Sequence, residues 1–136
     1  MEKPLVSIVL CAYDAGPLLV DALRSVLRQT WPNVEVLLVD DGSTDGSIEH
    51  ALAETAEEPT LSDGRCELRV LRQANAGKSA ALNLALDELR GDFYAMQDAD
   101  DVSAPNRIER QVAALLDNEQ LAGVFCGYDL LIGQGP

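Results

Sequence analysis

Residues 6–47 read VSIVLCAYDAGPLLVDALRSVLRQTWPNVEVLLVDDGSTDGS, and this stretch decides the fold. Two near-continuous apolar runs, residues 5–12 and 34–40, are rich in Val, Ile and Leu. Such runs are typical of strands that are buried on both faces. Between them, apolar residues recur at helical spacing after Pro17, which suits the first turn of a helix. A strand, a helix and a second strand in this order predict a parallel pair joined by a crossover helix.

The same alternation continues along the rest of the chain. The patterns predict helices at 47–58, 78–90 and 105–117, strands at 67–72, 92–97 and 121–128, and a surface loop at 59–65. Strands that alternate with helices indicate an α/β fold, in which a mainly parallel sheet has helices on both faces. Nothing follows the last predicted strand to cover it, so we expect the N-terminal part of a longer protein.

The composition is that of a globular protein with a strong negative charge. The chain has 136 residues, of which 47% are hydrophobic, and its formal net charge is −13. A surface of this charge repels phosphate backbones and anionic lipids, which argues against nucleic-acid binding and electrostatic docking to membranes. A single nucleotide held with a metal ion stays compatible with the charge, because a divalent cation offsets repulsion between the nucleotide and nearby carboxylates.

The cysteines and the apolar runs indicate the cellular compartment of the protein and whether it enters a membrane. Cys11, Cys66 and Cys126 are odd in number and widely spaced, which suggests neither a disulfide framework nor a zinc motif and fits a cytoplasmic protein. Cys11 and Cys126 fall in predicted strands, where we expect small core residues. The longest apolar region, residues 121–132, contains Asp129 and is shorter than the roughly 18 residues that span a bilayer. We therefore expect membrane association only through regions outside this sequence.

Polar and acidic residues follow each predicted strand. The segments in question are Ala12-Tyr13-Asp14, Asp40-Asp41-Gly42-Ser43, Asn75-Ala76-Gly77-Lys78 and Asp98-Ala99-Asp100-Asp101. Ligands of open parallel sheets bind beyond the carboxyl ends of the strands. We therefore expect a binding site where these four segments meet, while Asp41 is expected to shape its turn.

Asp98 and Asp100 stand two positions apart, so in an extended segment their side chains point to the same side. Two carboxylates placed in this way suit a hard cation such as Mg²⁺ or Mn²⁺, which also takes phosphate oxygens and water. The alternative is an acidic loop that caps the following helix. The spacing alone does not decide between the two interpretations.

The sequence does not match the common phosphate-binding and dinucleotide-binding motifs. Gly77-Lys78-Ser79 lacks the earlier glycine of a phosphate-binding P-loop, because position 72 is an arginine, and no GxGxxG follows a strand. The phospho-receiver domain remains a rival, since it also has an acidic pair after a strand. A receiver domain has its acidic pair after the first strand and needs a lysine after a late strand. Here Asp40-Asp41 follows the second strand, and no lysine occurs after Lys78.

Two blocks of the sequence resemble family 2 glycosyltransferases. The first is residues 6–47 quoted above, and the second, residues 75–112, reads NAGKSAALNLALDELRGDFYAMQDADDVSAPNRIERQV. The resemblance implies a GT-A fold, in which residues 1–136 form one domain that binds a nucleotide-diphospho-sugar, with UDP-sugar as the expected donor. It also implies Mg²⁺ or Mn²⁺ as cofactor and a C-terminal acceptor-binding part outside this sequence.

The resemblance assigns donor contacts to eight residues: Ala12, Tyr13, Asp14, Asp40, Gly77, Lys78, Asp98 and Ala99. Of these, Ala12, Tyr13 and Asp14 would line the pocket for the base. Asp40 would accept a hydrogen bond from the base, and Lys78 would lie near the phosphates. Asp98-Ala99-Asp100 matches the DXD motif of the family, in which Asp100 would hold the metal ion and Asp98 would contact the ribose or the hydrated metal.

The implied reaction is the inverting transfer of a hexose or hexosamine to a hydroxyl acceptor on a glycan or lipid, as in polysaccharide synthesis. Its general base would be an Asp or Glu beyond residue 136, so no residue here is assigned as catalytic. We expect this chain alone to be inactive. Because its last strand is uncovered, we also expect the chain either to associate as a homo-oligomer or to be marginally stable. The alternative is an inactive module that binds nucleotide without turnover.

Overall fold

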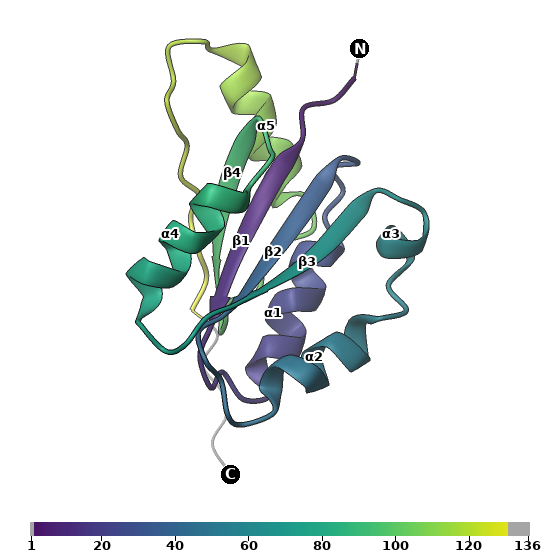
Figure 1. The fold of residues 1–136 in the computed structure, drawn as a ribbon. Helices are drawn as coiled ribbons and strands as arrows, with labels where there is room; N and C mark the ends of the chain where they lie inside the picture. The colour runs from purple at the N-terminus through teal and green to yellow at the C-terminus, as the bar shows by residue number, and fades with distance from the viewer. Residues whose placement is uncertain (1, 131–136) are drawn as a thin grey trace.

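A computed structural model of the protein describes residues 2–130. Its centre is a four-stranded sheet in the order β3-β2-β1-β4 (Figure 1). The strands are β1 (Val6–Ala12), β2 (Val34–Asp40), β3 (Cys66–Arg72) and β4 (Phe93–Asp98). Every neighbouring pair is parallel, and Val6 of β1 lies opposite both Val34 and Phe93. The predicted parallel sheet is confirmed.

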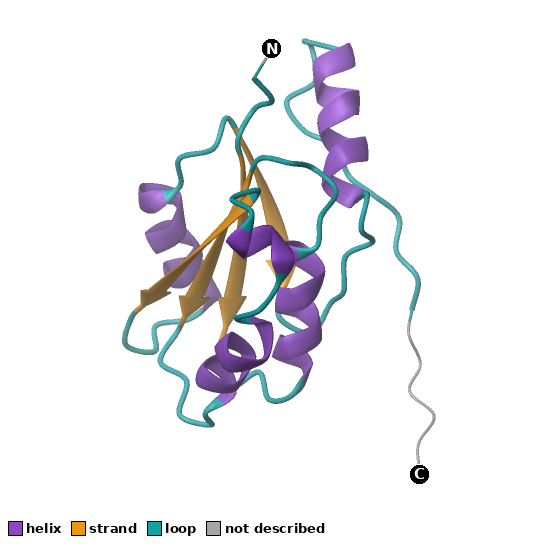
Figure 2. Cartoon of the chain, turned by 90° about the vertical axis from the view of Figure 1, so that its right-hand side faces the viewer, coloured by secondary structure: helices purple, strands orange, loops and turns teal. Residues whose placement is uncertain are grey.

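Helices cover both faces of this sheet (Figures 1 and 2). They are α1 (Leu18–Leu27), α2 (Ser47–Thr55), α3 (Pro59–Ser62), α4 (Lys78–Glu88) and α5 (Arg107–Asp117). Ile8 and Leu10 of β1 belong to a core shared with α1, α2 and α5, whereas Val9 packs with α4 on the other face. Burial on both faces explains why β1 and β2 are apolar at successive positions. Within residues 2–130, none of the helices has the length and apolar character that crossing a bilayer requires.

Two predictions about secondary structure are wrong. The segment 59–65 contains the short helix α3 rather than only a loop. Residues 121–128 do not form a strand, and Cys126, expected in the core, is exposed. An apolar run becomes a strand only where it pairs with a sheet edge, and Gly123 and Gly127 weaken this run further.

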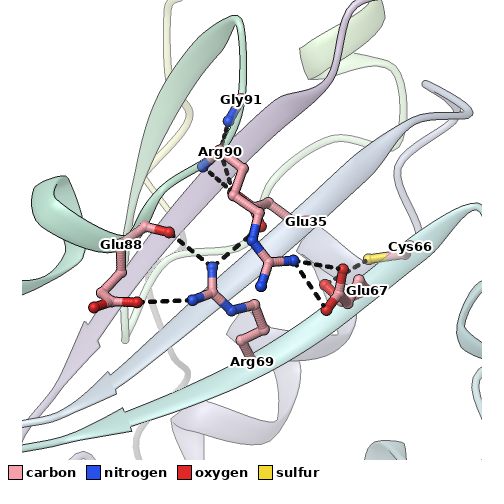
Figure 3. A network of polar contacts seen from close by, with 8 residues as sticks. Glu35, Cys66, Glu67, Arg69, Glu88, Arg90 and Gly91 are labelled. Atoms are coloured by element: carbon pink, nitrogen blue, oxygen red, sulfur yellow. Dashed lines mark hydrogen bonds and ion pairs between the residues drawn. The ribbon is translucent and has the colours of Figure 1, made fainter.

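A buried carboxylate organises the amino ends of the strands (Figure 3). Glu35 of β2 is only 1% exposed. It accepts hydrogen bonds from Ser7 Oγ at 2.6 Å, from the backbone N–H of Arg90 at 2.7 Å and from Arg69 Nη1 at 3.4 Å. Buried charges are tolerated when they are paired and hydrogen-bonded in this way. Glu35 thereby joins β1 and β3 to the connection between α4 and β4.

Gly91 lies in that connection, in close contact with β1. Its backbone N–H donates to Ser7 Oγ at 2.8 Å. A Cβ atom at this position would lie 2.5 Å from Ser7 Oγ, 2.6 Å from the carbonyl oxygen of Phe93 and 2.7 Å from Ser7 N. The backbone therefore leaves no space for a side chain here.

We predict that Gly91→Ala lowers the free energy of unfolding by about 1–3 kcal/mol, as is usual when atoms are forced into a packed region. Urea denaturation of the variant and the wild type measures the difference. Gly123→Ala is the matched control, because a Cβ atom at Gly123 meets nothing within 4 Å. Equal midpoints for Gly91→Ala and the wild type would contradict the close contact.

Glu58, which precedes α3, ties this short helix to α1. It accepts hydrogen bonds from Arg28 Nε at 2.8 Å and from Arg24 Nε at 3.1 Å. These bonds, with Arg28 as the larger contributor, lower the pKa of Glu58 below its ordinary value of 4.5. A carboxyl whose pKa is lower in the folded state stabilises the protein above the unfolded-state pKa, and this contribution disappears as the pH falls through the folded-state pKa.

We therefore predict that Glu58→Gln destabilises the protein at pH 7 by about 1 kcal/mol. The difference from wild type should shrink as the pH falls below 4.5, because the wild-type carboxyl then becomes neutral as well. Thermal unfolding across a pH series provides the measurement. Glu57→Gln, at an exposed neighbour, serves as control, and a pH-independent effect of Glu58→Gln would refute the ionic explanation.

Candidate functional site

A cleft of about 530 Å³ opens at the carboxyl edge of the sheet. It is formed by the end of β1, the start of α1, the residue after β2, the start of α4 and the end of β4. The residues that line it are Cys11, Ala12, Tyr13, Ala15, Leu18, Asp41, Lys78, Ala81, Asp98, Ala99 and Asp100. The cleft thus lies at the edge where the ends of the strands predicted a site.

Three carboxylates gather beside the cleft, and two of them, Asp98 and Asp100, line it. Single oxygen atoms of Asp98, Asp100 and Asp101 lie within 4.8 Å of one another, and all three residues are exposed. Oxygen atoms grouped in this way are the ligands that hard divalent cations prefer, so these residues fit Mg²⁺ or Mn²⁺. The alternative interpretation as a helix cap is wrong, because α5 begins only at Arg107 and no side chain caps it.

Gln97, the buried residue before Asp98, holds the acidic loop in place. Its Nε2 donates to the carbonyl oxygen of Asp101 at 2.7 Å. Its Oε1 accepts hydrogen bonds from Ser103 Oγ at 2.5 Å and from Arg107 Nη1 at 3.1 Å. The shape of the loop therefore depends on β4 and α5 together. The exposed carboxylates are not needed to hold the backbone of this loop, because Gln97, Ser103 and Arg107 do so.

Lys78 is the cation of the cleft. It is the first residue of α4, and its Nζ donates to Asp98 Oδ1 in an ion pair. This hydrogen bond raises the pKa of Lys78 above its ordinary value, so the side chain is charged at neutral pH. A charged amine beside a group of carboxylates gives the cleft both signs of charge, as a metal-bound phosphate ligand requires.

Asp41 also lines the cleft, although the sequence analysis gave it only a role in the turn. It accepts hydrogen bonds from Gln73 Nε2 at 2.8 Å, from the backbone N–H of Ala76 at 2.8 Å and from that of Gly77 at 3.0 Å. These bonds, led by that from Gln73, lower the pKa of Asp41. Strand alternation could have placed it, because Asp41 continues the face of Leu37, which packs against α4.

Asp40 and Asp14 do not line the cleft. The carboxylate of Asp40 is buried, pairs with Arg72 Nη1 at 2.8 Å and accepts a hydrogen bond from the backbone N–H of Ser43 at 2.8 Å. Asp14 has a positive φ of 44° and accepts a hydrogen bond from the backbone N–H of Thr44 at 2.7 Å. Both carboxylates therefore shape the loops after β1 and β2.

The loops after β2 and β3 touch each other beneath Lys78. Gly42 has a φ of 81°, and a Cβ atom there would lie 2.7 Å from the backbone nitrogen of Asn75. Gly77, also predicted to contact the donor, does not line the cleft and instead donates its N–H to Asp41. The start of α4 is consequently fixed to the end of β2.

The remaining lining is apolar, and the sequence analysis did not assign most of it. Tyr13 is 55% exposed at the end of β1, and Leu18 at the start of α1 is equally exposed. Cys11 is partly buried, which raises the pKa of its thiol. The others in this group are Ala12, Ala15, Ala81 and Ala99. An exposed aromatic ring beside small side chains can stack on a flat ring of a ligand.

The cleft thus combines an acidic cluster, an amine and an apolar wall. Of the nine residues predicted to bind the donor or metal, it is lined by Ala12, Tyr13, Lys78, Asp98, Ala99 and Asp100. Such a surface can hold a ligand that has a flat apolar part and a metal-bound anionic part.

Comparisons with known proteins find relatives that match most of this chain. A glycosyltransferase of Haemophilus influenzae is 31% identical over 129 residues, which are 95% of this chain and 38% of the relative. The mannosyltransferase PcManGT from Pyrobaculum calidifontis, solved with GDP-Man and Mn²⁺, has a TM-score of 0.74 and 28% identity over 85% of this chain and 33% of its own. TarS 1-349 of S. aureus, solved with UDP-GlcNAc, has a TM-score of 0.69 and 25% identity over 82% of this chain and 31% of its own.

These structural neighbours have the GT-A fold, which confirms the fold that the sequence resemblance implies. The chain spans 38% of the length of the Haemophilus relative. A family model described as glycosyl transferase family 2 matches residues 7–129, which also removes the phospho-receiver domain as an alternative. The match extends over nearly all of the described residues, from the start of β1 past α5, and the chain therefore belongs to glycosyl transferase family 2.

Proposed function

We propose that the protein takes part in the transfer of a sugar from a nucleotide-diphospho-sugar to a hydroxyl acceptor, and that residues 1–136 form the donor-binding domain. The observation that carries this proposal is the meeting of the acidic cluster, Lys78 and Tyr13 in one cleft. PcManGT was solved with GDP-Man and Mn²⁺ and TarS with UDP-GlcNAc, which supports a donor of this class. UDP-sugar is our proposed donor.

In this proposal each lining group has a role that follows from its chemistry. Tyr13 and Ala12 contact the base, and the Lys78 ammonium neutralises the diphosphate. Asp100 and Asp98 hold Mg²⁺ or Mn²⁺, which when bound stabilises the negative charge that develops on the leaving diphosphate. Asp14, Asp40 and Gly77 act indirectly, through the loops that they hold.

The inverting reaction also needs a general base for the acceptor hydroxyl, and the cleft offers no suitable group. A general base works best when its pKa lies near the operating pH. The lowered pKa of Asp41 makes it a poor base, and Asp98 and Asp100 are assigned to the metal. We propose that the base and the site for a glycan or lipid-linked acceptor belong to sequence that the longer relatives have and this chain does not match.

Without that base, residues 1–136 bind the donor but do not turn it over, which also describes the alternative of an inactive nucleotide-binding module. We place the reaction in the cytoplasm, in the synthesis of a glycan or cell-surface polysaccharide. The three cysteines support a reducing compartment, since all are free thiols. Assay of sugar transfer after fusion of this chain to the C-terminal part of a longer relative would separate the two possibilities, because only a competent donor domain would then support transfer.

The test is calorimetric titration of the chain with UDP, GDP and ADP, with and without Mn²⁺. We predict that UDP binds most tightly and only with Mn²⁺. Asp100→Asn should weaken this binding about tenfold or more, because even partners of metal ligands contribute that much. Thermal unfolding should change little, since Asp100 is exposed.

Asp87→Asn provides the matched control, because it removes the same charge from an exposed position on α4 outside the cleft. Its affinity for UDP should equal that of the wild type. Unchanged binding by Asp100→Asn, or equal binding of UDP with and without Mn²⁺, would contradict the assigned metal site.

A further inference from the structure

The acidic cluster already has a cationic partner in the structure. Lys78 Nζ donates to Asp98 Oδ1, although the two side chains are 62% and 52% exposed. Within residues 2–130, this is the only ion pair made by Asp98, Asp100 or Asp101. Lys78 therefore neutralises one member of the cluster directly, while Asp100 and Asp101 have no ion-pair partner among these residues.

The backbone fixes the point from which Lys78 reaches the cluster. Asp41 accepts hydrogen bonds from the N–H groups of Ala76 and Gly77, and Gly77 has a φ of 96°. The loop that leads into α4 is thus anchored immediately before Lys78. The only other lysine in the sequence, Lys3, lies over the ring of Trp31. The long side chain of Lys78 can still move, because more than half of it is exposed.

The Lys78 ammonium and a divalent cation need the same carboxylate, that of Asp98. Lys78 pairs with Asp98, one of the three carboxylates that would hold a metal ion at this cluster, and two cations only a few ångströms apart repel each other. Lys78 must therefore leave Asp98 before the carboxylate is free. Losing the ion pair costs less when the ammonium finds another anionic partner nearby.

We propose that Lys78 is an internal counter-ion that blocks Asp98 in the free protein and moves to the donor diphosphate when metal and nucleotide bind together. The inference rests on the proposed function and goes beyond it, because it assigns Lys78 two alternating partners. Metal binding alone breaks the Lys78–Asp98 pair without replacement, whereas nucleotide supplies a replacement. Metal and nucleotide consequently strengthen each other's binding, and by thermodynamic linkage the two effects are equal.

The experiment measures Mn²⁺ binding to the 136-residue chain by electron paramagnetic resonance of the free ion, with and without UDP. In the wild type, UDP should tighten Mn²⁺ binding. Lys78→Met should tighten the binding of Mn²⁺ alone by about fivefold or more, because a competing charge is removed, and should reduce the gain from UDP. Lys78→Arg should behave like the wild type, since its guanidinium also pairs with a carboxylate.

Lys3→Met makes the same chemical change away from the cleft and should leave Mn²⁺ binding unchanged. Equal tightening by Lys3→Met would show an effect of net charge alone and overturn the inference. Unchanged or weaker binding of Mn²⁺ alone to Lys78→Met would also overturn it, while UDP-dependent binding in the wild type would still support the donor site. If the wild type bound neither Mn²⁺ nor UDP, both proposals would fail. Circular dichroism melting of each variant confirms that it is folded.

Discussion

The burial of β1 and β2 on both faces is the constraint on which the other features of this chain depend. Strands surrounded by apolar side chains on both sides leave only their ends for polar chemistry. The amino and carboxyl ends of the strands have different roles. At the amino edge, Glu35 is buried and fully partnered, and it holds the connection between α4 and β4. At the carboxyl edge, the acidic cluster is exposed and the cleft opens beside it.

The partners of each carboxylate determine what it can do. Glu35, Asp40 and Asp41 are saturated by arginine, serine, glutamine or backbone N–H groups, so they serve the structure first. In the part of the chain that the structure describes, Asp98 is paired with the exposed Lys78 side chain alone, and both Asp98 and Asp100 reach solvent, so their oxygens become available to a ligand once Lys78 moves. Buried acidic residues thus stabilise the structure, whereas exposed ones are candidates to bind a ligand.

Much of this could be predicted from the sequence. Long apolar runs and helical spacing located the four strands and four of the helices, and the polar segments after the strands located the edge that bears the cleft. The roles of the adjacent Asp40 and Asp41 were harder to assign. Strand alternation could have placed Asp41 on the face of Leu37, but the pairing of Asp40 with Arg72 on β3 becomes visible only in the structure. The strand expected at 121–128 failed because apolar composition does not reveal whether a partner edge is present.

The position of β4 has a consequence for handling the protein. In the described residues, β4 is the outer strand beside β1, and Tyr94 and Met96 are exposed on it. An open strand edge is a template for pairing with another molecule. The net charge of −13 opposes such pairing at low ionic strength. Because the screening length falls from about 10 Å at 0.1 M salt to about 3 Å at 1 M, concentrated salt removes this protection and favours aggregation of the protein.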